Sequence, residues 1–232
     1  MRLAEIKRTI ADNIIKTNHY THKVCTGTKY SLGVWVDGEI KGVVQLGKGI
    51  HKINAWVEGS THNEWLEVNR NWLSDELPHN SESKVWGMVF KWLREHHPEI
   101  KWLITFANGI SGHVGTQYQA TNWIYTGYNT KGGFWVTKDG EMIHPLTLHS
   151  KGIGTKRKEV EEVYGTPLYR VKCGQFRYFY FLDKSYQPKL KLQQLPYPKQ
   201  TDLENIVEVF TEDWQLPQPL WGEVRELITK RK

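Results

Sequence analysis

The sequence has very little cysteine and no long apolar segment. Its 232 residues include two cysteines, Cys25 and Cys173, which stand far apart and belong to no Cys-x-x-Cys motif. This excludes a disulfide framework and argues against a structural zinc site. The longest apolar runs have five or six residues, whereas a membrane-spanning helix needs about 20. The amino end is charged throughout, unlike a signal peptide, so we expect a cytoplasmic protein with no membrane partner.

Aromatic residues are plentiful, and they are sufficient for a folded core. Hydrophobic residues make up 39% of the chain and aromatic residues 12%, which excludes a wholly disordered protein. Ten histidines raise the question of a metal. The local pairs His19/His22 and His96/His97 have no carboxylate or third ligand near them in sequence, so we name no metal ligands.

The positive charge is concentrated in one segment. Residues 1–149 carry a net charge of +2, residues 150–200 one of +7, and residues 201–232 one of −3. Aromatic residues are interleaved with the basic ones, which is typical of a surface that binds nucleic acid. A solvated face beside an aromatic core is the alternative. The candidate phosphate contacts are Lys156, Arg157, Lys158, Arg170 and Lys172.

These charges suggest three regions. We expect a catalytic core over 1–149, a basic and aromatic DNA-binding extension over 150–200, and an acidic tail with a last helix over 201–232.

The predicted elements indicate an α+β fold with a mixed β-sheet flanked by helices. Leu3, Ile6, Ile10 and Ile14 have helical spacing and predict a helix over 3–17. Asp37-Gly38 predicts a hairpin between strands 30–36 and 40–46. Further elements are expected as a strand at 64–72, a helix from about 85 to near 98, strands at 102–106 and 123–128, a hairpin of 134–136 with 142–144, a helix at 156–164, strands at 168–172 and 176–182, and a helix at 220–229.

The strand at 64–72 changes from apolar to polar along its length. Strict alternation would place Trp65, Glu67, Asn69 and Asn71 on one face and Arg70 on the other. A buried Arg70 needs an anionic partner; Glu67, Glu82 and a substrate phosphate are the candidates, so a structural ion pair and a functional role both remain open.

A polar loop, 77–83, leads from this strand into the next helix. The first amides of a helix lack partners within the helix and attract anions. Asn80, Ser81 and Ser83 are therefore candidate ligand-binding residues. Ordinary helix capping by Asn80 or Ser81 is the alternative.

This arrangement resembles the GNAT acyltransferase fold. Residues 116–123 (TQYQATNW) stand where GNAT proteins carry a tyrosine four residues before a Gly-Phe pair. The resemblance aligns Tyr118 with the tyrosine that acts as general acid, and Asn108 with an asparagine often found after the preceding strand. It also implies an acyl-coenzyme A donor bound at the helix after the fourth strand. Residues 77–83 contain no glycine and include Glu82, unlike the glycine-rich GNAT loop, so acyl-coenzyme A or a related donor remains open.

More specific sequence words resemble the Mom family of phage Mu and related phages, from about residue 10 to 200. They are EVNRNW (67–72), DELP (75–78), NSES (80–83), GTQYQATNW (115–123) and LPYPK (195–199). The resemblance implies transfer of a carbamoylmethyl group to the exocyclic amine of adenine in double-stranded DNA, which protects phage DNA from host restriction.

On this interpretation the base is flipped out of the duplex. The residues expected to line its cleft are Asn69, Arg70, Ser81, Asn108 and Tyr118. Tyr118 would give a proton to the leaving group, although a buried tyrosine with a satisfied hydroxyl is the structural alternative. Two other functions remain open: a GNAT-like acyl or aminoacyl transferase acting on another amine, and a non-catalytic DNA-binding phage protein.

Overall fold

The chain forms two compact units, each built from several segments. The computed structural model describes residues 1–49, 54–109, 112–129, 133–165, 168–173, 175–203, 207–211, 214–215 and 219–230. The first unit comprises 1–106, 116–126 and 178–195, and the second comprises 107–115, 127–177 and 196–232. The boundaries of the two compact units therefore differ from the boundaries between the charged regions. The division at 149/150 into a catalytic core and a DNA-binding extension stays a prediction.

A seven-stranded mixed sheet supports the first unit, which confirms the predicted fold class. Its strand order is β1-β2-β3-β4-β5-β10-β6. The strands are β1 (Arg2–Glu5), β2 (Thr28–Val36), β3 (Glu39–Gly47), β4 (Trp65–Leu73), β5 (Trp102–Asn108), β10 (Gln175–Phe181) and β6 (Ile124–Asn129). β1 to β4 pair antiparallel, whereas β4 and β5 pair parallel. Their connection is α2 (Ser81–His96).

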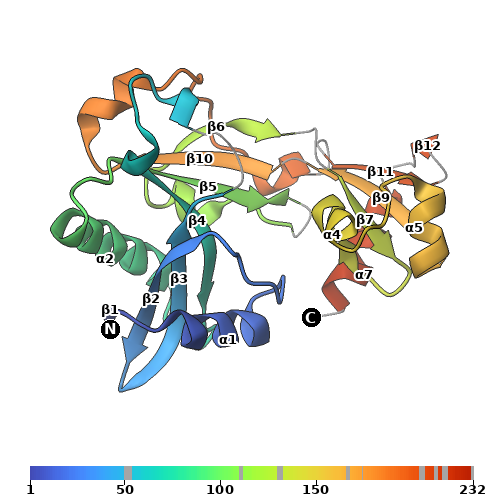
Figure 1. The fold of residues 1–232 in the computed structure, drawn as a ribbon, viewed down its shortest axis with the longest axis horizontal. Coiled ribbons are helices and arrows are strands. Elements are labelled where there is room, and N and C mark those ends of the chain that lie inside the picture. Colours follow the sequence, from blue (N-terminus) through green and yellow to red (C-terminus); the bar gives the residue numbers. More distant parts are fainter. Residues whose placement is uncertain are drawn as a thin grey trace. The chain divides into compact units, whose positions relative to one another are not determined.

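The β2–β3 hairpin forms as predicted. Asp37 and Gly38 have φ values of 51° and 87°, the left-handed pair that a tight two-residue hairpin turn requires. Helix α1 (Arg8–Asn18) lies along this hairpin (Figure 1) and buries Ala11 and Ile15 against Val43.

The predicted helix over 3–17 is wrong at its start. Residues 2–5 form β1, which pairs with residues 32–35 of β2. Ile10 is 43% exposed, so the helical spacing of Leu3, Ile6 and Ile10 did not mark the buried face. Pairing with a distant strand overrides the local preference of this segment.

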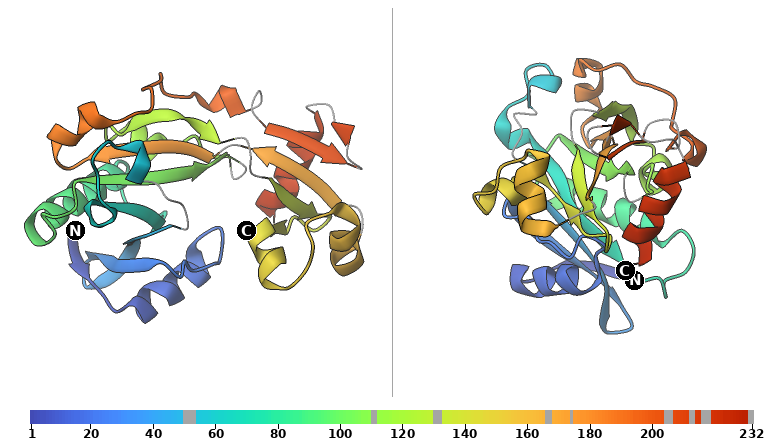
Figure 2. Two further views of the ribbon diagram at one scale, coloured as in Figure 1. Left: turned by 45° about the horizontal axis from the view of Figure 1, so that its top comes forward. Right: turned by 90° about the vertical axis from the view of Figure 1, so that its right-hand side faces the viewer.

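A five-stranded sheet forms the second unit, in the order β12-β11-β9-β7-β8. Its elements are β7 (Phe134–Thr137), β8 (Met142–Ile143), α4 (Pro145–Ser150), α5 (Arg157–Tyr164), β9 (Leu168–Cys173), β11 (Val207–Thr211), β12 (Trp214–Gln215) and α7 (Pro219–Lys230). Val136 packs with Val224 and Ile228 of α7, and its neighbour Trp135 packs with Leu148 of α4 and Val160 of α5. Because successive strand residues point to opposite faces, helices cover both faces of this sheet (Figures 1 and 2).

Short elements complete the described chain. They are the 3-10 helices Asn54–Trp56, His62–Glu64, Lys184–Lys189 and Gln200–Asp202, and the single turn α3 (Thr116–Gln119). No helix in the described ranges combines the length and apolar character needed to cross a bilayer.

Candidate functional site

A bulge in β4 reorganises the polar end of that strand. Gln45 of β3 pairs with Arg70 and the next residue, Leu46, pairs with Val68, so Asn69 is an extra residue on β4. A bulge redirects the side chains that follow it. The strict alternation predicted for β4 is therefore wrong beyond Asn69.

Glu67 and Asn69 lie on the face of the sheet that α1 covers. Val43 contacts α1, and Gly47, four residues later on β3, pairs directly with Glu67. A Cβ atom on Gly47 would collide with Oδ1 of Asn69, and one on Gly49 would collide with Oε2 of Glu67. The two glycines therefore provide the space for this carboxylate and carboxamide. Asn69 is one of the predicted site residues, whereas the sequence suggested Glu67 only as a partner of Arg70.

Burial raises the pKa of the Glu67 carboxyl to about 7, although the nearby Arg70 charge lowers it. The folded pKa lies above the ordinary value of 4.5, so the stability due to Glu67 is complete below about pH 4.5 and is lost as the pH rises through 7. Glu67→Gln cannot ionise. We expect it to raise the free energy of unfolding at pH 8 by about 3 kcal/mol and to change it little at pH 5, as thermal melts would show. Equal effects at both pH values would contradict the buried ionisation.

Asn71 points to the opposite face. It pairs with Val44, whose side chain points away from α1, and its amide nitrogen donates to Oε1 of Gln117 at 2.6 Å. The indole nitrogen of Trp86, on α2, donates to the same oxygen at 3.2 Å. Gln117 therefore links β4, α2 and α3, a role that only the folded chain reveals.

Tyr118 is next to Gln117 on α3 and is 6% exposed. Its hydroxyl forms a hydrogen bond with Thr105 of β5, and its ring contacts Trp86, Trp123 and Tyr178. Burial raises the pKa of this hydroxyl to about 12, against the opposing effect of the Thr105 bond. Tyr118 therefore keeps its proton at neutral pH, as a general acid must.

The pairing of β4 with β5 ends near Asn69 and near Thr105, the hydrogen-bond partner of Tyr118. The recorded partners are Trp65 with Trp102, Leu66 with Leu103, and Glu67 with Ile104. Thr105 directly follows the last pair on β5, and Asn69 lies two residues beyond it on β4. The structure thus brings Asn69 and Tyr118 to the same end of the β4–β5 pairing, on opposite faces of the sheet.

Arg70 has partners other than those expected. Its guanidinium donates to the backbone oxygens of Lys23 at 2.7 Å and Asn69 at 2.6 Å. Of the anionic partners that the sequence suggested, Glu67 is the one whose pKa the Arg70 charge lowers. Arg70 thus ties β4 to the segment after α1.

The start of α2 leaves backbone amides available. Asn80 has a left-handed backbone (φ 65°) and makes no side-chain capping bond. Ser81 is buried, and its hydroxyl donates to the Pro78 oxygen at 2.6 Å. No hydrogen bond joins the amides of Glu82 and Ser83 to another described residue. In this structure, therefore, neither Asn80 nor Ser81 caps α2 with its side chain.

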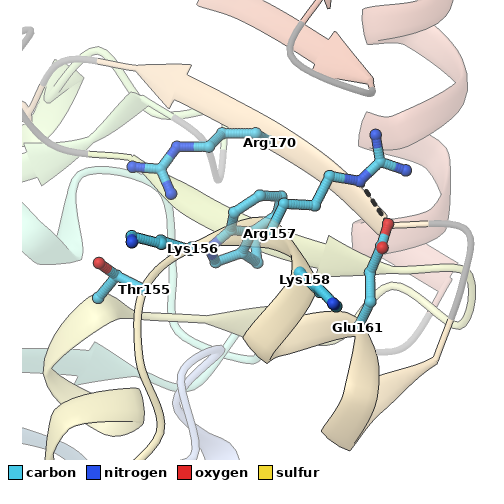
Figure 3. Close-up of a pocket in the computed structure, with 7 residues that line it drawn as sticks. Thr155, Lys156, Arg157, Lys158, Glu161 and Arg170 are labelled. Atoms are coloured by element: carbon cyan, nitrogen blue, oxygen red, sulfur yellow. Dashed lines mark hydrogen bonds and ion pairs between the residues drawn. The ribbon is translucent and has the colours of Figure 1, made fainter.

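The remaining predicted residues belong to the second unit. Asn108 ends β5 in that unit, and its backbone oxygen accepts from the His113 amide. Lys156, Arg157, Lys158 and Arg170 line one open pocket of about 700 Å³ (Figure 3). The side chain of Lys172 lies outside the described part of the chain.

This basic pocket contains both paired and unpaired cations. Arg157 forms an ion pair with Glu161, also on α5. The Arg170 guanidinium lies over the Trp135 ring, 4.9 Å from its centre, and no hydrogen bond or ion pair joins it to another described residue. Arg170 is therefore held in place with its N–H donors available for an anion.

The histidines that the structure describes do not assemble with carboxylates into a recognisable metal centre. Within the described ranges, no three His, Cys, Asp or Glu side chains are arranged to hold a metal ion. His97 instead contacts Tyr30 and Glu99, each at 3.1 Å.

Residues 1–199 match the Mom protein family. The chain belongs to this family. Among curated proteins, "Methylcarbamoylase mom" of Escherichia phage Mu is 29% identical over 204 residues, which span 86% of this chain and 84% of that protein. The Mom match includes β4, α2, α3 and the basic pocket, and leaves out residues 200–232.

Two of the solved structures that are similar to this member of the Mom family are acetyltransferases. An N-acetyltransferase from Staphylococcus aureus Mu50 is 11% identical, with a TM-score of 0.40, over 78% of this chain and 97% of that chain. The aminoglycoside acetyltransferase AAC(6')-Ib, in complex with coenzyme A and kanamycin, is 16% identical, with a TM-score of 0.35, over 53% of this chain and 70% of that chain.

Proposed function

We propose that this protein is a phage-type transferase that places a carbamoylmethyl group on the exocyclic amine of adenine in double-stranded DNA. The observation that carries the proposal is the Mom family match, which spans both the Tyr118 region and the basic pocket. The name of the phage Mu relative, a methylcarbamoylase, supports the type of group transferred. We expect the protein to act in the cytoplasm of the bacterial host.

The chemistry requires a proton donor near the reacting atoms. The adenine amine is a weak nucleophile because its lone pair is delocalised into the ring, so the enzyme must orient it and stabilise the departing group. In the transfer, a bond forms between the amine nitrogen and the incoming carbon, and the bond to the leaving group breaks. The leaving group takes a proton from Tyr118, which is protonated at neutral pH. The proton that the amine loses then restores the Tyr118 hydroxyl, directly or through water.

An anionic part of the donor would bind at the start of α2. The Glu82 and Ser83 amides point along the helix axis toward its N-terminus, where the helix dipole adds a partial positive charge. These amides suit a single anionic group, such as a phosphate of acyl-coenzyme A or of a related donor. The exposed Glu82 carboxylate on the same turn argues against a highly charged one.

Ser81→Ala removes the hydroxyl that fixes the loop before α2. We expect adenine modification in cells to fall about fivefold, the effect of one hydrogen bond of about 1 kcal/mol. DNA affinity, measured by fluorescence anisotropy, should not change. An equal loss of DNA affinity would place Ser81 at the DNA surface instead.

The basic pocket is suited to the DNA backbone. Lys156, Lys158 and Arg170 bring positive charge to one concave surface, and Arg170 presents a guanidinium fork that matches a phosphate. Base flipping would then deliver the adenine from a duplex held by such contacts.

Restriction of purified DNA tests the function. Plasmid DNA from cells that make the protein should resist restriction enzymes whose sites contain adenine, even after all protein is removed. A non-catalytic DNA-binding protein would leave the purified plasmid fully cleavable, and so would a transferase that acts on another class of amine.

A further inference from the structure

Three buried polar atoms without partners lie together on the α1 face of β4. They are Oε2 of Glu67 and both Oδ1 and Nδ2 of Asn69, and no hydrogen bond joins any of them to another described residue. Asn69 is only 7% exposed. Such groups are rare because each loses its hydration without compensation. A carboxamide with both ends unpaired is therefore suited to a ligand with a matching pair of groups.

The surroundings of these atoms are shaped to hold them. The glycines at 47 and 49 leave no side chain between β3 and the two groups, and a Cβ at either position would occupy their space. Asn69 is also the bulged residue of β4 and lies two residues beyond Glu67, the last β4 residue that pairs with β5. A planar ligand bound to its carboxamide would therefore not have to break a β4–β5 pair.

The unpaired atoms define a hydrogen-bonding pattern. An ionised Glu67 and Oδ1 of Asn69 are acceptors, and Nδ2 of Asn69 is a donor. An amino-substituted base edge carries the complement, two N–H donors beside a ring-nitrogen acceptor. At purine C6 and pyrimidine C4, adenine and cytosine carry this amine beside a ring nitrogen, whereas guanine and thymine carry a carbonyl oxygen there. Asparagine is a common partner of adenine for this reason.

We propose that Glu67 and Asn69 read the amine edge of the target base, with Asn69 as the specificity-determining residue. This rests on the proposed function, which selects adenine over cytosine. Glu67 and Oδ1 of Asn69 accept the two N–H groups of the exocyclic amine, and Nδ2 donates to the neighbouring ring nitrogen. The amine is thereby held beyond Glu67–Ile104, the last β4–β5 pair, where no pairing of described residues separates it from the face that carries the proton donor Tyr118.

The test compares adenine with analogues that lack one ring nitrogen. Duplexes containing adenine, 7-deazaadenine or 1-deazaadenine are incubated with purified protein in a bacterial extract that supplies the donor, and modified nucleosides are quantified by mass spectrometry. The wild type should modify one of the two analogues about 10- to 100-fold less than adenine, as expected for loss of a base-reading hydrogen bond. Asn69→Leu should lose this discrimination, and Asn71→Leu, on the opposite face, should keep it.

Thermal stability separates reading from a structural role. Leucine has a similar volume and removes an unpaired buried amide, so the melting temperature of Asn69→Leu should stay the same or rise by a few degrees. A marked fall would show that the carboxamide supports the fold, and would overturn the proposal. Equal ratios for wild type and Asn69→Leu on both analogues would overturn it too. If the proposed function itself fails, the wild type will leave even ordinary adenine unmodified.

Discussion

Tyr118→Phe is expected to lower adenine modification by about 10²- to 10⁴-fold, the usual contribution of a positioned proton donor. The hydroxyl is buried, bonded to Thr105, and protonated up to a pH of about 12. Phenylalanine retains the ring contacts with Trp86 and Trp123, so the fold should change little. DNA affinity should also be nearly unchanged, because the substitution removes no charge.

The measurement is the amount of modified adenine per microgram of DNA, with melting temperature and DNA affinity determined for the same variant. Tyr30→Phe is a matched control, since Tyr30 is also buried in the first unit and its hydroxyl contacts His97 rather than β5. Wild-type modification by Tyr118→Phe would remove the general-acid role. A loss of stability as large as the loss of activity would assign the hydroxyl to the core.

Neutralising Lys156, Arg157 and Lys158 together should weaken DNA binding across all sequences and flatten its salt dependence. Each phosphate contact contributes about 0.9 to the slope of log affinity against log salt. Three contacts would therefore remove up to about 2.7. If Arg157 stays paired with Glu161, two contacts would remove about 1.8. Sequence preference should be unaffected.

Glutamine at all three positions, with binding followed by fluorescence anisotropy at several salt concentrations, measures this change. The charge-matched control replaces Lys7, Lys16 and Lys29, which are exposed residues of the first unit. The control should keep the wild-type slope. If the α5 variant also keeps it, this helix face is simply solvated, and DNA recognition lies elsewhere.

Local sequence signals predicted the elements that depend on local interactions. The Asp37-Gly38 turn requires two residues with positive φ, and the sequence provides a pair that adopts it. The helix at 157–164 and the strand at 102–108 also follow local patterns. By contrast, β1 and β11 exist because they pair with β2 and β9. No local pattern in residues 2–5 or 207–211 specifies those distant partners.

The residues of the candidate site also fall into those that the sequence indicated and those that only the folded chain reveals. Composition located the basic pocket, and family resemblance located Tyr118. The bulge at Asn69 depends on the register of β3 against β4, so sequence alternation assigned Asn71 to the wrong face. Glu67 and Gln117 acquire their roles from the Gly47/Gly49 backbone and from contacts with Trp86, which only the folded chain brings together.

The most direct test of the account is mass spectrometry of nucleosides digested from the DNA of bacteria that express the protein. We predict a deoxyadenosine heavier by one carbamoylmethyl group in place of hydrogen, absent from cells with an empty vector and strongly reduced with Tyr118→Phe. DNA containing only unmodified deoxyadenosine, from cells in which the soluble wild-type protein is abundant, would contradict it.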